Sequence, residues 1–215
     1  MTTLISFYTN DWKYPQHAER LKAECESFGV PYKIEQLKST GSYLKNTCLK
    51  PQFILDCLND LKSPVLWVDV DASLLGKPET PIKRNYVDVF DGYEIKSVEV
   101  LGELPDFAAK RMSEERDRTW HVGTMWFNYK PNVIEFLEKW IANTGNLSDE
   151  SALEKTWQDD GWMLDTFDLP KEYFYIERIS QEPPEGTVIM HRISDSNMKK
   201  REMRTAKIKR DRGVW

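Results

Sequence analysis

The stretch Pro64-Val-Leu-Trp-Val-Asp69-Val-Asp71-Ala72 constrains the fold of this chain more than any other segment. Four apolar residues in a row, followed by acids, are typical of a central parallel strand that is buried on both faces. The acids then stand at the carboxyl end of that strand, where open α/β sheets bind their ligands. The segment therefore predicts both a buried strand and a site at its end.

The residues before this strand alternate between strand and helix patterns. Apolar runs at residues 4–9 and 32–37 predict strands, and residues 15–28 and 51–61 carry apolar side chains at helical spacing. A β-α-β-α-β order predicts a doubly wound, parallel sheet flanked by helices. Asn10, after the first strand, should then lie at the same sheet edge as the two acids.

The second half of the chain has a less regular pattern. Residues 77–85 contain two prolines and predict a loop, and Ser148 followed by two acids predicts a capped helix start. Six further segments have the pattern of a strand, and one has the pattern of an amphipathic helix. The predicted strands are 87–90, 95–100, 107–109, 121–128, 173–176 and 187–190, and the predicted helix is 132–143.

The Asp-x-Asp motif carries the clearest chemical signal. Side chains two residues apart on a strand point to the same face, so Asp69 and Asp71 should lie together. Two carboxylates about 4 Å apart repel by roughly 4 kcal/mol at an effective dielectric constant near 20. A hard divalent cation, Mg²⁺ or Mn²⁺, would relieve this repulsion and bind phosphate oxygens. Taken alone, the motif also fits an acidic loop with a helix cap.

Six short motifs follow one another in a recognisable order. They are Phe7-Tyr-Thr-Asn10, Lys50-Pro-Gln-Phe-Ile54, the Asp-x-Asp strand, Val122-Gly-Thr-Met-Trp-Phe-Asn128, Asp149-Glu-Ser-Ala-Leu153 and Val188-Ile-Met-His191. The series, which covers most of residues 4–195, resembles the nucleotide-diphospho-sugar transferases of the GT-A fold. The resemblance implies one GT-A-like, Rossmann-like α/β domain at residues 1–198, with a central mixed, mostly parallel sheet flanked by helices.

The resemblance also implies a metal site and a pair of catalytic residues. Asp69, Asp71 and His191 would hold Mn²⁺ or Mg²⁺, with Asp69 also near the ribose, and an imidazole ligand suits Mn²⁺ better. Asp149 and Glu150 match the acidic pair that contacts the transferred sugar in these enzymes. Both acids equally fit a structural role at a helix N-terminus, and Asp159-Asp160 is a rival pair.

Further residues are assigned by the resemblance to the nucleotide-sugar pocket. They are Tyr8, Thr9 and Asn10 around the base and ribose, Lys50 near the nucleotide, Gly123 and Thr124 where the backbone approaches the donor, Asp106 and Arg111 facing the donor, and Lys199 near the diphosphate. Lys50 also fits a surface lysine, and Lys199 also fits a solvated tail.

The implied activity is transfer of a hexose or pentose from a nucleoside-diphosphate sugar, expected to be a UDP-sugar, to an acceptor hydroxyl. The motif series slightly favours retention at the anomeric carbon, and the acceptor is a saccharide, a protein or DNA. Two alternatives stay open. Asp-Val-Asp-Ala-Ser resembles the first motif of Asp-nucleophile phosphatases, although a full β-α-β-α unit precedes it here. The other alternative is a non-catalytic module that binds nucleotides or nucleic acid.

Composition excludes some classes of protein and suggests a compartment. With 40 % hydrophobic residues the chain can bury a core, which excludes global disorder. No run of 18 apolar residues is present, so no membrane span is expected. The three cysteines have no metal-type spacing, and the first residues do not resemble a signal peptide. We therefore expect reduced thiols and a cytoplasmic protein. Beside the mostly longer members of the family that it resembles, so short a chain suits an enzyme of a bacterial cell or a virus-infected host.

Basic residues gather at the end of the chain. Residues 199–215 contain eight Lys or Arg and two acidic residues, in a chain whose net charge is −5. Such a tail fits contact with phosphates, which is the reason to consider DNA as acceptor, or a solvated helix end. We expect it to lie outside the transferase domain.

Overall fold

The strand and helix patterns of the first 70 residues are present in the computed structural model, with one additional short helix. The structure describes residues 2–79, 84–91, 94–101, 104–112, 119–145, 147–177 and 182–192.

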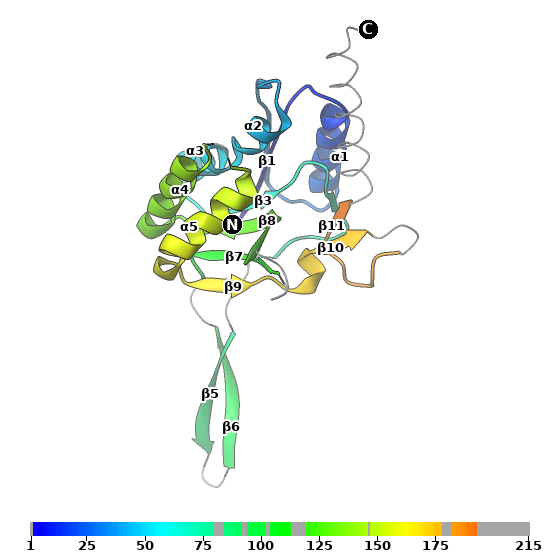
Figure 1. Ribbon diagram of the computed structural model, residues 1–215. Helices are drawn as coiled ribbons and strands as arrows, with labels where there is room; N and C mark the ends of the chain where they lie inside the picture. Colours follow the sequence, from blue (N-terminus) through cyan, green and yellow to red (C-terminus); the bar gives the residue numbers. More distant parts are fainter. Residues whose placement is uncertain are drawn as a thin grey trace, which may run out of the picture.

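The elements of this part of the chain are shown in Figure 1. The strands are β1 (Thr3–Tyr8), β2 (Tyr32–Gln36), β3 (Val65–Val68), β4 (Ser73–Leu74), β5 (Arg84–Asp91), β6 (Glu94–Leu101), β7 (Phe107–Arg111), β8 (Trp120–Phe127), β9 (Thr166–Asp168), β10 (Tyr175–Glu177) and β11 (Ile189–Arg192). The α-helices are α1 (Tyr14–Ser27), α2 (Tyr43–Thr47), α3 (Lys50–Leu61), α4 (Pro131–Asn143) and α5 (Asp149–Asp160), and two 3₁₀ turns are η1 (Gly161–Met163) and η2 (Lys171–Tyr173).

A six-stranded sheet in the order β2-β1-β3-β8-β7-β9 forms the centre of the fold. β1 is parallel to β2 and β3, and β7 is parallel to β9. β8 is antiparallel to both β3 and β7. The mixed, mostly parallel sheet is therefore confirmed, whereas the purely parallel arrangement holds only for the first three strands.

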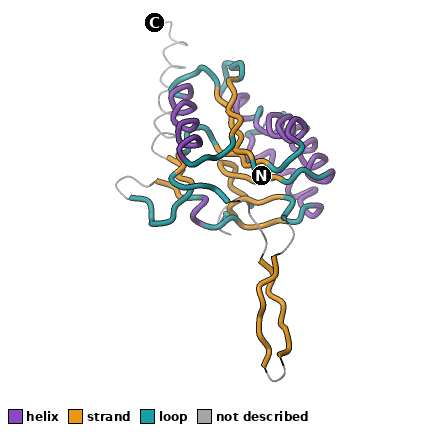
Figure 2. The backbone as a smooth tube through the Cα atoms, turned by 180° about the vertical axis from the view of Figure 1, so that it is seen from behind, coloured by secondary structure: helices purple, strands orange, loops and turns teal. Residues whose placement is uncertain are grey.

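Two smaller sheets accompany it. β4 joins β10 and β11 in the order β10-β11-β4, which carries β11 alongside the loop after β3. β5 and β6 form an antiparallel hairpin that projects from the body in both views (Figures 1 and 2). The two strands predicted at 87–90 and 95–100 are thus the arms of one longer hairpin. Of the loop predicted at 77–85, residues 80–83 lie outside the described residues, and Arg84 already belongs to β5.

Helices cover both faces of the main sheet, and β3 explains why. Val65 and Trp67 pack in the core formed with α3, α4 and α5, whereas Leu66 and Val68 pack in the core formed with α1. Successive strand residues face opposite sides, so a strand that is covered on both sides needs a continuous apolar run.

The described helices include none that is both long enough and apolar enough to span a membrane. Cys25, Cys48 and Cys57 are free thiols.

Replacing Phe107 by Ala should lower the free energy of unfolding by about 3–5 kcal/mol, as is typical for truncating a buried Phe. The Phe107 side chain is fully buried, and its ring contacts those of Trp120 and Phe127. Trp162, which is 82 % exposed, provides the control, and Trp162→Ala should change stability by less than about 0.5 kcal/mol. Urea unfolding measures both variants, and equal losses would contradict this placement of the core.

Candidate functional site

The carboxyl ends of β1 and β3 lie at one edge of the main sheet. The two strands are parallel neighbours, so Tyr8–Asn10 and Asp69–Asp71 leave the sheet side by side. Thr124 on β8 pairs with Val68, which brings the Gly-Thr segment of β8 to the same edge. Three of the predicted site segments therefore come together here.

A buried lysine connects β3 to the start of α5. Lys50, the first residue of α3, is only 4 % exposed. Its Nζ lies 3.1 Å from Asp69 Oδ1 and 2.7 Å from Asp149 Oδ2. It also donates to the backbone carbonyl of Val122 at 3.2 Å. Because an ammonium group has three N–H donors, these three acceptors account for all of them. Lys50 is thus a buried link between elements, and the surface-lysine alternative is wrong.

Local structure explains why these carboxylates reach the lysine. Trp67 and Asp69 share a face of β3, and the Trp67 indole N–H donates to Asp69 Oδ1 at 3.0 Å. The Lys50 ammonium lies 5.2 Å from the centroid of the Trp67 ring, which adds a cation–π contact. Asp149 is the first residue of α5, and Ser148 caps that helix as the sequence predicts. A carboxylate is favoured at this position by the helix dipole.

Burial and mutual repulsion change the pKa values of the cluster. Burial acts to lower the pKa of Lys50, but Asp149 and Asp69 outweigh it and raise that pKa above its usual value. Burial raises the pKa of Asp69, against the effect of Lys50. Burial, followed by the negative charge of Asp69, raises the pKa of Asp71 to about 7. Near neutral pH, Asp71 therefore binds a proton readily, and a cation would compete for the same charge.

His191 lies within β11, next to β8. Its Nε2 is 2.8 Å from Thr124 Oγ1, and the residue is buried. Burial, and to a smaller extent the charge of Lys50, lower the pKa of His191 to about 3. The imidazole is therefore neutral at physiological pH, which is the form that binds metal ions.

Gly123 lies against two imidazole rings. A Cβ at this position would be 2.6 Å from His121 Cε1 and 2.7 Å from His191 Cε1, closer than side chains tolerate. The Gly123 N–H donates to His121 Nδ1 at 3.0 Å, and the His121 ring centroid is 3.9 Å from that of Phe174. This crowding explains why a residue without a side chain stands here, whereas the approach of the donor to this backbone stays a prediction.

The end of β1 belongs to a polar cluster centred on Asp11. The buried Thr9 donates to Asp11 Oδ2 at 3.0 Å, and Ser39 and Asn46 donate to the same oxygen. These bonds join β1 to the loop after β2 and to α2. Tyr8–Asn10 therefore lie where the sequence expects the nucleotide, and the contact itself stays a prediction.

Asp106 lies at the opposite end of the strands from the Asp-x-Asp motif, so the structure does not bring it together with Asp69 and Asp71. It precedes β7, which begins level with Phe127 and hence with Val65 at the start of β3. Its carboxylate accepts bonds from Lys130 Nζ and Asn132 Nδ2, both at 2.7 Å. Asp106 is a buried structural acid that joins strand and helix ends.

The remaining predicted residues differ in their positions. Arg111 ends β7, is exposed and lies 5.7 Å from the ring centroid of Trp120. Glu150 is half-buried in the first turn of α5, beside Asp149. Lys199 and the basic tail at residues 199–215 lie outside the described residues.

The predicted metal triad is not assembled. In the part of the chain that the structure describes, no group of three or more His, Cys, Asp or Glu side chains could hold a metal ion. His191 Nε2 contacts Thr124, whereas Asp71 is influenced by the charge of Asp69. The two carboxylates do fit a hard divalent cation, because they offer oxygen ligands and unbalanced negative charge. The metal site therefore stays a prediction that rests on Asp69 and Asp71.

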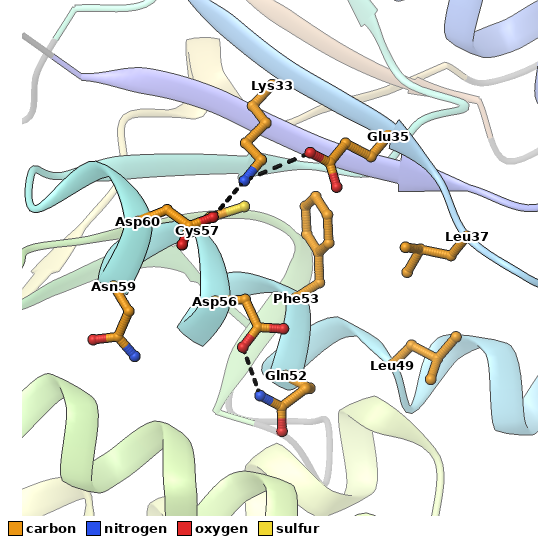
Figure 3. A pocket seen from close by; sticks show the side chains of 10 residues that line it. All are labelled: Lys33, Glu35, Leu37, Leu49, Gln52, Phe53, Asp56, Cys57, Asn59 and Asp60. Carbon is orange, nitrogen blue, oxygen red and sulfur yellow. Dashed lines mark hydrogen bonds and ion pairs between the residues drawn. The ribbon is translucent and has the colours of Figure 1, made fainter.

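A separate hollow of about 510 Å³ lies between β2 and α3 (Figure 3). Lys33 extends across it toward Asp60 and Glu35, at 2.8 and 3.5 Å. Apolar side chains, among them Leu37 and Phe53, line it as well. No predicted site residue lines this hollow, so it is distinct from the charged cluster.

Two side chains of the cluster are not predicted from the sequence. Trp67 has the pattern of a core residue, although its spacing of two from Asp69 is a signal that identifies it. Tyr43 belongs to the five-residue helix α2, which has no pattern in the sequence. Tyr43 is 39 % exposed, and partial burial, followed by the charges of Asp69 and Asp149, raises its pKa to about 12.

Three solved structures share the architecture of this chain. The first is a glycosyltransferase involved in the glycosylation of the major capsid of PBCV-1, with a TM-score of 0.61 and 12 % identity, covering 94 % of this chain and 97 % of that one. The others are two structures, one an apo-form, of the glycosyltransferase GlyE of Streptococcus pneumoniae TIGR4. Their TM-scores are 0.54 and 0.52 at 15 % and 16 % identity, and each match covers 90 % of this chain and 54 % of GlyE. The chain has the fold of these glycosyltransferases.

The likeness is confined to three-dimensional structure. No protein-family model matches the sequence, and no curated protein matches it either. The match spans about half the length of GlyE.

Replacing Lys50 by Met should destabilise the protein by about 3–5 kcal/mol, because it leaves the buried Asp149 and the half-buried Asp69 without their cation. Lys139 offers a matched control, since it also bridges two carboxylates, at 3.0 and 2.7 Å, but is 36 % exposed. Lys139→Met should cost far less, because water screens exposed ion pairs. Urea unfolding at pH 7 compares the two, and equal effects would contradict the buried bridge.

The stability of the metal-free protein should fall as the pH rises from about 4 to about 7 because of Asp71. Its pKa of about 7 lies above the unfolded value of about 3.9, so the folded state binds more protons in this interval. The loss amounts to at most about 4 kcal/mol. Asp71→Asn should remove that part of the pH dependence. Urea unfolding with a chelator present measures it, and identical pH profiles for the variant and the wild type would show that Asp71 titrates normally.

Proposed function

We propose that this chain is a metal-dependent glycosyltransferase that moves a sugar from a nucleoside-diphosphate sugar, a UDP-sugar in the first instance, to an acceptor hydroxyl. The observation that carries the proposal is the buried cluster in which Lys50 joins Asp69 to Asp149 at the carboxyl edge of the sheet. The fold shared with glycosyltransferases supports it.

Asp69 and Asp71 would hold Mn²⁺ or Mg²⁺, with His191 as a further ligand. When bound, such an ion stabilises the negative charge that grows on the departing diphosphate. The neutral state of His191, which its lowered pKa ensures, suits this role. The proton on Asp71 would leave as the cation binds, because the two compete for one carboxylate.

Asp149 and Glu150 would contact the transferred sugar. Lys50 fixes Asp149 Oδ2 at 2.7 Å, so this carboxylate is held before any substrate arrives. Such pre-organisation lowers the reorganisation needed when charge develops at the anomeric carbon. The role of Lys50 is therefore to position the two acids, since all of its N–H donors are used within the protein. We propose retention of configuration at the transferred sugar.

Tyr8–Asn10, Gly123 and Thr124 would border the donor, since they share the sheet edge with the Asp-x-Asp motif. The PBCV-1 neighbour is involved in the glycosylation of a capsid protein, and for this reason a glycoprotein belongs among the acceptors tested, beside free saccharides and DNA.

Replacing Asp71 by Ala should lower turnover of the preferred nucleotide sugar at least about 100-fold, the loss expected when an electrostatic partner of the leaving group is removed. Asp168, a carboxylate on β9 that is 47 % exposed and pairs with Lys110, is the control, and Asp168→Ala should retain activity within about twofold. The assay incubates the chain with Mn²⁺, a panel of nucleotide sugars and an acceptor mixture, and measures released nucleoside diphosphate.

Unchanged turnover in Asp71→Ala would contradict the role of the motif. Release of phosphate from simple esters, without release of diphosphate from any nucleotide sugar, would favour a phosphatase. Nuclear magnetic resonance of the anomeric proton of the product tests retention.

A further inference from the structure

Two residues of α1, Arg20 and Glu24, form hydrogen bonds with the backbone of the loop that follows the Asp-x-Asp motif. Arg20 Nη2 donates to the backbone carbonyls of Asp71 and Ala72, at 3.0 and 2.9 Å. Glu24, one helical turn later, accepts the backbone N–H of Leu74 on its Oε2 at 2.8 Å. Residues four apart on a helix share a face, so α1 presents one donor and one acceptor to the same loop.

The two side chains also support each other. Arg20 Nε lies 3.5 Å from Glu24 Oε1, and Arg20 Nη1 lies 3.1 Å from His17 Nδ1. The side chains of Arg20 and Glu24 are only 26 % and 21 % exposed, respectively. A guanidinium group can make these contacts at once because its five N–H groups point outward in a fixed plane, which a lysine cannot reproduce.

The loop held by α1 leads directly to the strand that carries His191. Leu74 and Ser73 form β4, which pairs with Ile189 and Met190 of β11. His191 is the next residue along β11. The backbone at Asp71 and the position of His191 are therefore set through one short connection, and Arg20 and Glu24 attach that connection to α1.

We propose that Arg20 and Glu24 are positioning residues that hold the backbone at Asp71 in place, so that the Asp71 carboxylate can bind a divalent cation. This inference rests on the proposed function, because it assigns the two residues a purpose in metal binding. Neither residue belongs to one of the six sequence motifs.

Amide hydrogen exchange tests, without any substrate, whether Arg20 and Glu24 hold the loop in place. Glu24→Ala and Arg20→Met should speed exchange at Ala72–Leu74 at least tenfold, because the loop loses its anchors. Glu19→Ala is the matched control, since Glu19 lies on the same helix but is 71 % exposed and pairs only at the surface with Lys22. Exchange rates that match the control would overturn the proposal.

Calorimetric titration with Mn²⁺ tests whether the contacts of Arg20 and Glu24 support metal binding. Glu24→Ala and Arg20→Met should raise the dissociation constant for Mn²⁺ at least about tenfold, while Glu19→Ala leaves it within twofold. Arg20→Lys keeps the charge without the planar fork, so it should give an intermediate loss. It also keeps the test possible should Arg20→Met fail to fold. A role in stability alone would lower the unfolding midpoint but leave the Mn²⁺ affinity of the folded protein unchanged, which would overturn the proposal.

The outcomes separate this inference from the proposed function. Absence of Mn²⁺ and Mg²⁺ binding by the wild-type chain would overturn metal dependence and the metal-binding purpose of Arg20 and Glu24 together. Metal binding without any transfer from a nucleotide sugar would overturn the transferase only, and the variant affinities would still decide the roles of Arg20 and Glu24.

Discussion

The ammonium group of Lys50, buried between two carboxylates, is the interaction on which the candidate site depends. It connects the first turn of α3 to the end of β3, to the first residue of α5 and to the backbone of β8. A charged group that is shielded from water is stable only when oppositely charged or hydrogen-bonding partners compensate its lost hydration. The three acceptors around this nitrogen do so, and they hold Asp69 and Asp149 in fixed positions relative to each other.

The cluster still carries more negative than positive charge. Asp69, Asp71 and Asp149 outnumber Lys50 and Arg20, and burial, followed by the charge of Asp69, raises the pKa of Asp71. Binding of a cation stabilises a site with this imbalance. Ionisation of all its carboxylates without a cation destabilises it. The proposed cation would balance part of this charge, and the pairing of β4 with β11 connects the loop after Asp71 to the strand that carries His191.

Much of the fold follows from patterns that can be seen within a few residues. The apolar run at Val65–Val68 predicts a strand covered on both sides, and the structure places it in the middle of the sheet. The helix at α2 and the full length of the β5–β6 hairpin are not predicted, since α2 is too short for a periodic pattern. The antiparallel direction of β8 is not predicted either, because side-chain periodicity is the same for both directions of a strand.

The sequence by itself determined the Asp-x-Asp pair, the strand that carries it and the glycine beside it, because alternation along a strand and the lack of a side chain are local properties. Only the tertiary structure decided which charges meet. Lys50 pairs with Asp69 and Asp149, Asp106 lies at the far edge, and Arg20 reaches the carbonyl of Asp71. These contacts join residues far apart in the chain, and they depend on strand order and direction, which local periodicity does not encode.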